Sequence, residues 1–362
     1  MDVKDRFYEI DLLRFLAALA VVLYHYTFRG FAEGGYSPVE YPVLGEIFKY
    51  GFYGVQLFFI ISGFVILMTA SKRDAPNFVI SRITRLYPAF WVCVTLTAGF
   101  ILWKGGEIFQ IGLVQYLLNL TMISGFAGVA MVDGVYWTLL VEIKFYALIF
   151  VLLVFGQIKR IEWFLAFWLV LTAVSMVVTL PKIVTFLFLT GWSPFFIAGA
   201  LFYLVKQNGM NLVRGAMLVG SLLLSLWQNL NEIKHLAVVY ESDFSPFIGS
   251  AVIIVCFAVF LLVSLGHTKG LSSQKLIKLG VLTYPLYLIH QNIGFMLFQE
   301  LGDSVNRYVL LLALVSLMLV VSWLIHLLVE QPLGLWMNIK LKQLWGKFGR
   351  ADQAIKPVKP IV

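Results

Sequence analysis

The sequence predicts an all-α, polytopic membrane protein: a transmembrane helical bundle of about ten spans. Of its 362 residues, 60% are hydrophobic and only 13% are charged, and the mean hydropathy is +0.89. A typical soluble domain is about half apolar and about one quarter charged, so this composition excludes an ordinary soluble globule. Apolar runs of about 17–25 residues, the length that crosses a bilayer, recur along the chain.

These runs define the predicted spans, which we place at 10–29, 50–70, 86–103, 135–155, 162–180, 185–205, 212–228, 247–266, 281–300 and 308–329. Segment 108–124 is apolar but short and flanked by glycine, which predicts a re-entrant or interfacial segment. No long hydrophilic stretch separates the runs, so residues 1–350 are predicted to form one membrane domain. The polar tail 351–362 contains proline and is predicted to be disordered and cytoplasmic.

The distribution of Lys and Arg predicts the orientation of the chain. With the N-terminus inside the cell, 19 of the 27 Lys and Arg residues fall on the cytoplasmic side and six on the other. Both termini are therefore predicted to be cytoplasmic. The net charge of +8 follows from these basic loops, so we expect no nucleic-acid partner. No CxxC pair, HExxH motif or glycine-rich phosphate loop occurs, and we expect no metal.

The first span carries three ionisable residues, Asp11, Arg14 and His25. Charge at membrane depth is costly and usually marks a functional position. At about 100° per residue, His25 returns to within roughly 20° of the face of Arg14, about 16 Å along the helix. Asp11 lies on the same face, one turn before Arg14. The alternative is structural: Asp11 and Arg14 form an interfacial ion pair, and His25 reaches the opposite surface.

The fourth span runs inward and places Glu142 about 10 Å below the outer surface, at a depth similar to that of His25. A carboxylate beside an imidazole orients the ring and raises its basicity, so we expect Glu142 to orient His25. Tyr146 lies one turn deeper on the face of Glu142, whereas Lys144 points away from both. The alternative is that Glu142 and Lys144 are unrelated structural ion partners.

Arg82 and Arg85 lie in the predicted loop after the second span, three residues apart on one helical face. At a cytoplasmic mouth, two guanidinium forks would suit a diphosphate. Basic residues beside a membrane are equally typical of positive-inside anchors that hold anionic lipid. In the second span itself, Gly54, Ser62 and Gly63 predict a surface that another helix can approach closely.

The ninth span begins with a polar stretch that is unsuited to contact with lipid. Two tyrosines, a histidine and two amides fall within ten residues: Tyr284, Tyr287, His290, Gln291 and Asn292. They are predicted to line the interior, either as core hydrogen-bonding groups or as the wall of a substrate pocket. His290 on its own would more often be a structural histidine. His326, with Glu330 one turn further on, is predicted to be structural.

Six stretches resemble the acyltransferase-3 family of bacterial membrane acyltransferases, and they follow the order of that family from residue 10 to residue 332. They are Arg14 to His25, Gly54 to Phe64, Arg82 to Pro88, Trp137 to Glu142, Thr283 to His290 and Val329 to Pro332. The chain departs from the family pattern at Thr138, at Pro285 and at Gln291-Asn292. These departures bear on the identity of the substrate more than on the type of reaction.

The resemblance implies transfer of an acyl group, most often acetyl from acetyl-CoA, to a hydroxyl of an envelope carbohydrate or glycolipid. It also implies a location in the bacterial inner membrane and functional roles for Arg14, His25, Arg82 and Arg85. On this basis Arg82 and Arg85 would hold the CoA phosphates, with Arg14 further along the acyl path. His25 would act as general base or carry the acyl group transiently.

The remaining candidate pocket residues are Asp11, Trp137, Tyr146, Tyr284, Tyr287 and His290. The competing class is a proton-coupled transporter or flippase of a polar or glycan substrate, because intramembrane ionisable residues suit a carrier equally well. The absence of a detectable internal repeat and of paired broken helices in the sequence argues against a carrier. A receptor or scaffold would leave the polar stripe of the first span without a purpose. Hydrolysis of acyl-CoA by the purified protein would distinguish the enzyme from both.

Overall fold

The protein is built from helices. The computed structural model describes residues 7–268, 270 and 272–354, and within these residues every regular element is helical. The helices of the first half are α1 (Tyr8–Tyr24), η2 (His25–Arg29), α2 (Gly30–Ala32), α3 (Pro42–Phe48), η3 (Lys49–Tyr53), α4 (Gly54–Ala70), α5 (Ala75–Lys104), α6 (Leu113–Asn119), η4 (Ser124–Ala127), η5 (Gly134–Tyr136), α7 (Trp137–Val154), η6 (Gln157–Arg160) and α8 (Ile161–Val177). Those of the second half are α9 (Lys182–Leu187), α10 (Ser193–Asn208), α11 (Leu212–Val239), α12 (Pro246–Leu265), η8 (Gln274–Leu276), α13 (Ile277–Gly280), α14 (Thr283–Leu301), α15 (Arg307–Ile325), η9 (His326–Glu330) and α16 (Gln331–Ala354).

Seven helical segments in the described part of the chain are long and apolar enough to cross a membrane. They are Tyr8–Ala32, Pro42–Ala70, Ala75–Lys104, Gly134–Val154, Gln157–Val177, Pro246–Leu265 and Arg307–Gly346. The protein is therefore an integral membrane protein with an all-α fold. The other three predicted spans overlap α10, α11 and α14, so every predicted span overlaps a helix, while the number of crossings stays a prediction.

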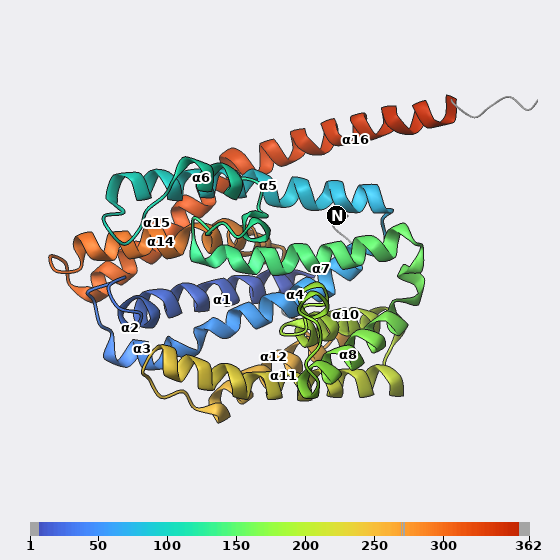
Figure 1. Ribbon diagram of the computed structural model, residues 1–362, viewed down its shortest axis with the longest axis horizontal. Helices are drawn as coiled ribbons and strands as arrows, with labels where there is room; N and C mark the ends of the chain where they lie inside the picture. The colour runs from blue at the N-terminus through green and yellow to red at the C-terminus, as the bar shows by residue number, and fades with distance from the viewer. Residues whose placement is uncertain (1–6, 269, 271, 355–362) are drawn as a thin grey trace, which may run out of the picture.

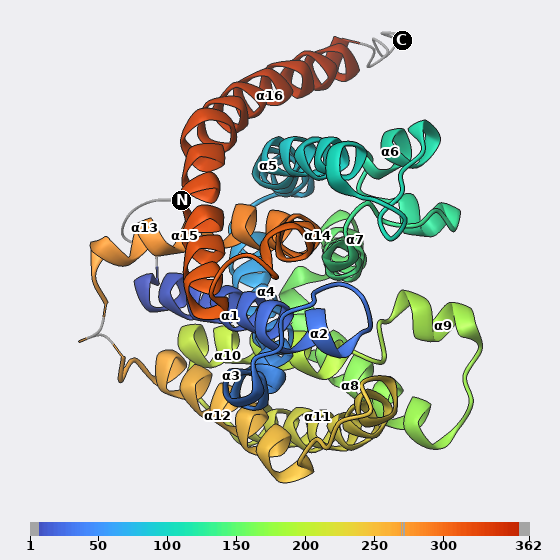
Figure 2. The same cartoon turned by 90° about the vertical axis from the view of Figure 1, so that its left-hand side faces the viewer.

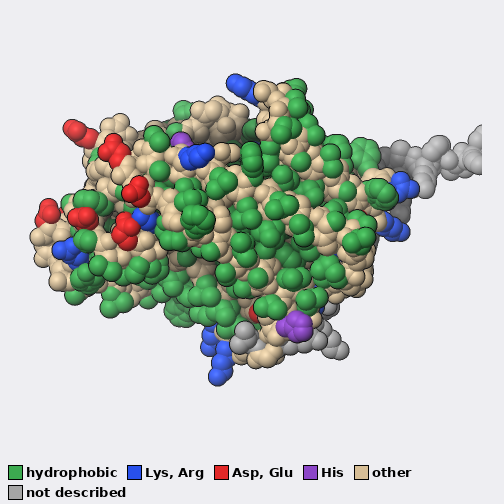
Figure 3. Space-filling model, turned by 90° about the horizontal axis from the view of Figure 1, so that it is seen from below, with side chains coloured by type: hydrophobic (Ala, Val, Ile, Leu, Met, Phe, Trp, Pro, Cys, Tyr) green, Lys and Arg blue, Asp and Glu red, His purple; other side chains and the backbone are tan. Residues whose placement is uncertain are grey.

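The long helices run side by side along the longest axis of the molecule, and α16 extends beyond the bundle at one end (Figure 1). Seen along this axis, α1 and α4 lie in the middle, with α5 and α6 on one side and α11 and α12 on the other (Figure 2). On the face seen in Figure 3, hydrophobic side chains cover the middle, while acidic side chains gather at one end. An apolar band between polar ends is what a bilayer requires.

Helices α10 and α14 are enclosed by the other helices of the bundle. All residues of α10 from Ser193 to Val205 are buried. In α14, all residues from Thr283 to Phe298 except Tyr284 and Leu297 are buried, and these include His290 and Asn292. Because neighbouring helices shield α14 from lipid, its polar residues find partners inside the protein. The prediction that this stretch lines the interior is confirmed.

The close approach of α4 and α10 depends on glycine. Gly63 and Gly199 face each other across this contact: a Cβ at Gly63 would overlap the carbonyl oxygen of Phe196, and one at Gly199 would overlap that of Ile60. Gly54 meets the backbone of α1 at Ala17 in the same way. The predicted packing role of Gly54 and Gly63 is confirmed, and it holds α4 against both α1 and α10.

Replacement of Gly199 by alanine is therefore expected to destabilise the bundle. The added methyl group would push α4 and α10 apart, and overpacking of this kind costs about 1–3 kcal/mol. The thermal unfolding midpoint of the purified protein in detergent should fall. Gly99→Ala on α5 is the matched control, because the space around Gly99 is open and alanine favours a helix. An equal midpoint for both variants would contradict the packing role of Gly199.

The structure corrects three predicted boundaries. The segment containing Arg82 and Arg85 is not a loop: α5 begins at Ala75, because Asp74 accepts a hydrogen bond from the backbone N–H of Asn77 and a proline occupies the first turn. The span at 185–205 is broken between α9 and α10, where Leu189 has φ +52° and Pro194 lies in the first turn of the new helix. Helix α11 continues to Val239 instead of ending near 228, because polar side chains at its end do not interrupt a helix.

The remaining predictions concern short or terminal segments. Segment 108–124 contains the short helix α6 and ends at the first residue of η4, and its position relative to the membrane stays a prediction. The last span continues directly into α16, which extends to Ala354. The rest of the predicted tail, 355–362, lies outside the described residues.

Candidate active site

Three cavities follow one another through the middle of the bundle. We call the first the basic mouth and the second the inner cavity. Both are lined by Arg14, Arg82 and Arg85. The inner cavity in turn shares Val55 and Tyr287 with the third, the outer cavity. The three volumes are about 730, 120 and 200 Å³. The polar stripe predicted on the first span therefore lies along a line of cavities.

The basic mouth gathers cationic side chains from α1, from α5 and from the turn between α4 and α5. Its Lys and Arg residues are Arg14, Lys72, Arg73, Arg82 and Arg85. The predicted association of Arg14 with Arg82 and Arg85 is present in the structure. The Asp11 side chain lies against Gly280 of α13, and no ion pair joins it to Arg14 in the part of the chain that the structure describes. A cavity of this size with this charge suits a polyanionic ligand.

Arg85 is held in place by η9, which is far from it in the sequence. It forms an ion pair with Glu330, whose second carboxylate oxygen lies 2.9 Å from Nδ1 of His326. The Arg85 guanidinium also lies 6.0 Å from the ring centre of Tyr284, and the Tyr284 hydroxyl donates to the carbonyl oxygen of Leu86 (3.2 Å). The Arg82–Pro88 and Val329–Pro332 stretches are thus joined by an ion pair. Glu330 and His326 position Arg85, which agrees with the structural role predicted for His326.

The inner cavity contains Glu142. The Tyr146 hydroxyl donates to the Glu142 carboxylate (3.0 Å), as expected for two residues one turn apart on α7. Lys144 lies on another face of α7, 4.1 Å from the ring centre of Phe186. Glu142 shares the inner cavity with Arg14, whereas His25 lines the outer cavity on the other side of Tyr287. The expectation that Glu142 orients His25 is wrong, because similar depth does not place two helices' side chains next to each other.

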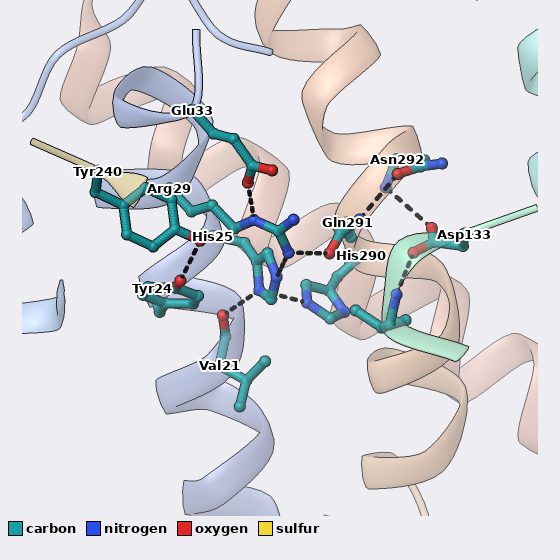
Figure 4. A network of polar contacts seen from close by, with 11 residues as sticks. Val21, Tyr24, His25, Arg29, Glu33, Asp133, Tyr240, His290, Gln291 and Asn292 are labelled. Carbon is teal, nitrogen blue, oxygen red and sulfur yellow. Dashed lines mark hydrogen bonds and ion pairs between the residues drawn. The ribbon is translucent and has the colours of Figure 1, made fainter. Parts of the chain in front are cut away.

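His25 lines the outer cavity. His290 lies beside it, at the position that had been predicted for the carboxylate of Glu142. Nδ1 of His25 lies 2.8 Å from the carbonyl oxygen of Val21 and 3.2 Å from Nε2 of His290 (Figure 4). Nδ1 of His290 lies 2.8 Å from the carbonyl oxygen of Tyr287. With both rings neutral, these contacts assign a proton to Nδ1 of each histidine. Nε2 of His25 is then the basic nitrogen.

Arg29 contacts that basic nitrogen. Its Nη1 lies 3.2 Å from His25 Nε2 and donates to the side-chain oxygen of Gln291 (3.0 Å), while its Nε donates to the carboxylate of Glu33. His25 to Arg29 form the π-helical turn η2, and its wide turn brings the side chains of these two residues together. Such turns are frequent at functional sites.

Asp133 anchors α14 next to the residues that contact His25 and Arg29. Its carboxylate accepts hydrogen bonds from the backbone N–H of Asn292 (3.0 Å) and that of Val135 (3.1 Å), and it is fully buried. The Asn292 side chain donates to the carbonyl oxygen of Val132 (2.9 Å) and accepts from Gln291 (3.1 Å). The two amides that depart from the family pattern therefore tie α14 to the segment before α7 and to Arg29.

Sequence reasoning missed Arg29, Glu33, Asp133 and the pairing of His25 with His290. Arg29 is the last residue of the first predicted span and follows His25 by four residues on the same helix, and this spacing was the available signal. Nothing in the sequence connects Asp133 to Asn292, which is 159 residues away.

Tyr287 lines both the inner and the outer cavity, whereas Trp137 lines the outer cavity alone. The Thr138 hydroxyl donates to the Tyr287 hydroxyl (2.9 Å), which places the Tyr287 side chain between the inner and outer cavities. Trp137 lines the outer cavity, with its ring centre 5.1 Å from that of Trp192. The predicted pocket residues Tyr146, Tyr284 and Tyr287 all line the inner cavity. Asp11 lines only the basic mouth.

The fold and the site define an integral membrane protein whose cavities place a cluster of cations at one end and a pair of histidines at the other. The sequence model of the acyltransferase-3 family, described as an acyltransferase domain, matches residues 7–327, and the chain therefore belongs to this family. By family it is a membrane acyltransferase, a class that requires an acyl donor and an acceptor.

Two curated proteins are similar to the chain. Acyltransferase MdmB of Streptomyces mycarofaciens is 26% identical, over 88% of this chain and 89% of its own length. Nodulation protein 10 of Rhizobium leguminosarum bv. viciae is 30% identical over 161 residues, which are 38% of this chain and 42% of that protein, so the chain spans less than half of that relative. No solved structure gives a significant match to the chain.

Proposed function

We propose that the protein moves an acyl group, most simply acetyl, from acyl-CoA at the basic mouth to a hydroxyl group in the outer cavity. The acceptor is a cell-envelope carbohydrate or glycolipid, and the site of action is the bacterial inner membrane. In this proposal the chain crosses the membrane about ten times with both termini cytoplasmic. The observation that supports this proposal is that three neighbouring cavities, each sharing lining residues with the next, lie between the five cations of the mouth and His25.

The donor is assigned from the charge and size of the cavities. Arg82 and Arg85 present planar guanidinium forks that match the phosphate groups of CoA, and Arg14 extends the cationic wall into the inner cavity. The inner cavity, at about 120 Å³, has room for only a few water molecules, which favours a short acyl group such as acetyl over a fatty acyl chain.

The reaction is assigned from the hydrogen bonds of His25. The acceptor hydroxyl takes the place of Arg29 at Nε2 of His25 and gives up its proton there as its oxygen attacks the thioester carbonyl carbon. The carbon–sulfur bond then breaks, and the CoA thiolate takes the proton from His25. The products are an ester and the CoA thiol.

Two neighbours support this chemistry. Nε2 of His290 accepts a hydrogen bond from Nδ1 of His25, which stabilises the imidazolium that forms. Arg29, once displaced from Nε2, can donate to the developing oxyanion. A transient acyl group on His25 Nε2 would use the same atoms, so the base and the covalent relay are two versions of one site.

A proton-coupled carrier would also need a path across the bundle, and the line of cavities is compatible with one. Family membership favours the enzyme. The test is incubation of membranes containing the protein with acetyl-CoA labelled in the acetyl group. Label should appear in a polysaccharide or glycolipid fraction, and CoA thiol should be released in equal amount. Absence of both, with folded protein and native glycans present, would favour the carrier.

A further inference from the structure

The outer cavity contains a buried amide group without a protein partner. Gln56 on α4 is only 6% exposed, it lines the outer cavity, and its Oε1 has no hydrogen-bond partner. A buried carbonyl oxygen that is left without a donor loses the hydrogen bonds it would make to water, which destabilises the protein. The position is therefore unfavourable unless a ligand in the cavity supplies the missing donor.

Glu232 on α11 lines the same cavity. Its carboxylate forms no ion pair or hydrogen bond within the part of the chain that the structure describes. The cavity therefore presents two hydrogen-bond acceptors, one neutral and one anionic. Arg29, the cation in its lining, is already bound to Glu33 and Gln291. The polarity of this cavity is thus opposite to that of the basic mouth.

Aromatic side chains form the rest of the wall. Trp137 and Trp192 lie on one side, with ring centres 5.1 Å apart, and the cavity is also lined by Tyr24, Phe52 and Tyr240. Its volume of about 200 Å³ is below the roughly 300–1,000 Å³ that is typical of drug-sized ligands. A single ring with one apolar face fits this space better than an extended oligomer.

We infer that Gln56 and Glu232 select the acceptor by accepting hydrogen bonds from hydroxyl groups adjacent to the one that is acylated. This inference rests on the proposed function. The acceptor group in the cavity is then an uncharged polyhydroxyl ring, which packs an apolar face on Trp137 and presents the reacting hydroxyl to His25. A ring bearing a carboxylate or phosphate is disfavoured, because Glu232 repels it in a water-poor site.

The test compares acceptors of similar ring size with the full-length protein in detergent and acetyl-CoA as donor. The acceptors are the methyl glycosides of glucose, galactose and mannose, methyl glucuronoside, and cyclohexanol, which has a single hydroxyl. At least one neutral glycoside should have a KM tenfold or more below that of cyclohexanol. The glucuronoside should be a poor acceptor.

Two variants assign the selection to the two residues. Gln56→Leu should raise the KM for the best glycoside about fivefold to tenfold, the effect of one lost hydrogen bond, while the KM for acetyl-CoA changes less than twofold. Glu232→Gln keeps the shape and removes the charge, so it should increase kcat/KM for the glucuronoside relative to the glucoside. This gain cannot result from misfolding.

Gln228→Leu is the matched control, because the Gln228 Oε1 is also buried without a partner but does not line the outer cavity. It should leave all acceptor ratios unchanged. Equal use of cyclohexanol and glycosides, or acceptor ratios that both variants leave unaltered, would overturn the selection role while the acyltransferase survives. Failure to transfer acetyl to any alcohol, together with failure to hydrolyse acetyl-CoA, would overturn the proposed function as well.

Discussion

Replacement of His25 by alanine is expected to lower the rate of acyl transfer by about 10²–10⁴-fold, the usual contribution of a general base. The reason is geometric: the proton on Nδ1 leaves Nε2 as the basic atom facing the outer cavity. The measurement is release of CoA thiol coupled to ester formation by purified protein. The KM for acetyl-CoA should change little, because the basic mouth is lined by other residues.

Two comparisons make the result specific. His267→Ala, at an exposed position after α12, should retain full activity. His290→Ala should lower kcat less than His25→Ala does, because His290 acts through its hydrogen bond to His25. Thermal midpoints of all three variants should be recorded. A folded His25→Ala protein with more than half of the wild-type rate would exclude His25 as base and as acyl carrier.

Replacement of Arg82 by alanine is expected to raise the KM for acetyl-CoA by about 10- to 100-fold. A hydrogen bond to a charged group contributes about 1.5–3 kcal/mol, and about 1.4 kcal/mol corresponds to a factor of ten. Arg82 lines both the basic mouth and the inner cavity, where the donor would pass. Initial rates over a range of acetyl-CoA concentrations give the KM, and kcat should fall much less.

Arg82→Lys should recover only part of the affinity, because an ammonium group lacks the planar fork that matches phosphate. Arg160→Ala is the matched control: Arg160 lies near the predicted cytoplasmic side but does not line the basic mouth. A KM for acetyl-CoA that is unchanged in Arg82→Ala would contradict the donor site and favour the alternative that this arginine is a membrane anchor.

Features that depend only on the position of a residue along a single helix could be predicted from the sequence. Hydropathy located the helices, because burial in a bilayer demands long apolar runs. Spacing placed Tyr146 next to Glu142, and Gly63 predicted a face of the second span that another helix approaches closely, which the structure shows to be α10. The family resemblance implied that Arg14 lies further along one path from Arg82 and Arg85, and the structure places all three in the lining of one cavity.

The lateral arrangement of helices could not be predicted in this way. Glu142 and His25 were predicted to lie at similar depth, yet they line different cavities on either side of Tyr287, and His290 lies beside His25. The π-helical turn at His25 also changes the helical spacing locally, which brings Arg29 into the site. Partners from distant helices are determined by packing, and no pattern within one helix contains that information.

The most direct test of the proposed acyl path uses sealed proteoliposomes. Labelled acetyl-CoA is enclosed inside, and a methyl glycoside that wild-type protein acylates in detergent is supplied only outside. Transfer along the line of cavities predicts labelled ester outside and unlabelled CoA inside, with wild type but not with His25→Ala. Labelled acetyl-CoA that appears intact outside, or ester that forms only when donor and acceptor share one compartment, would contradict transfer through the bundle.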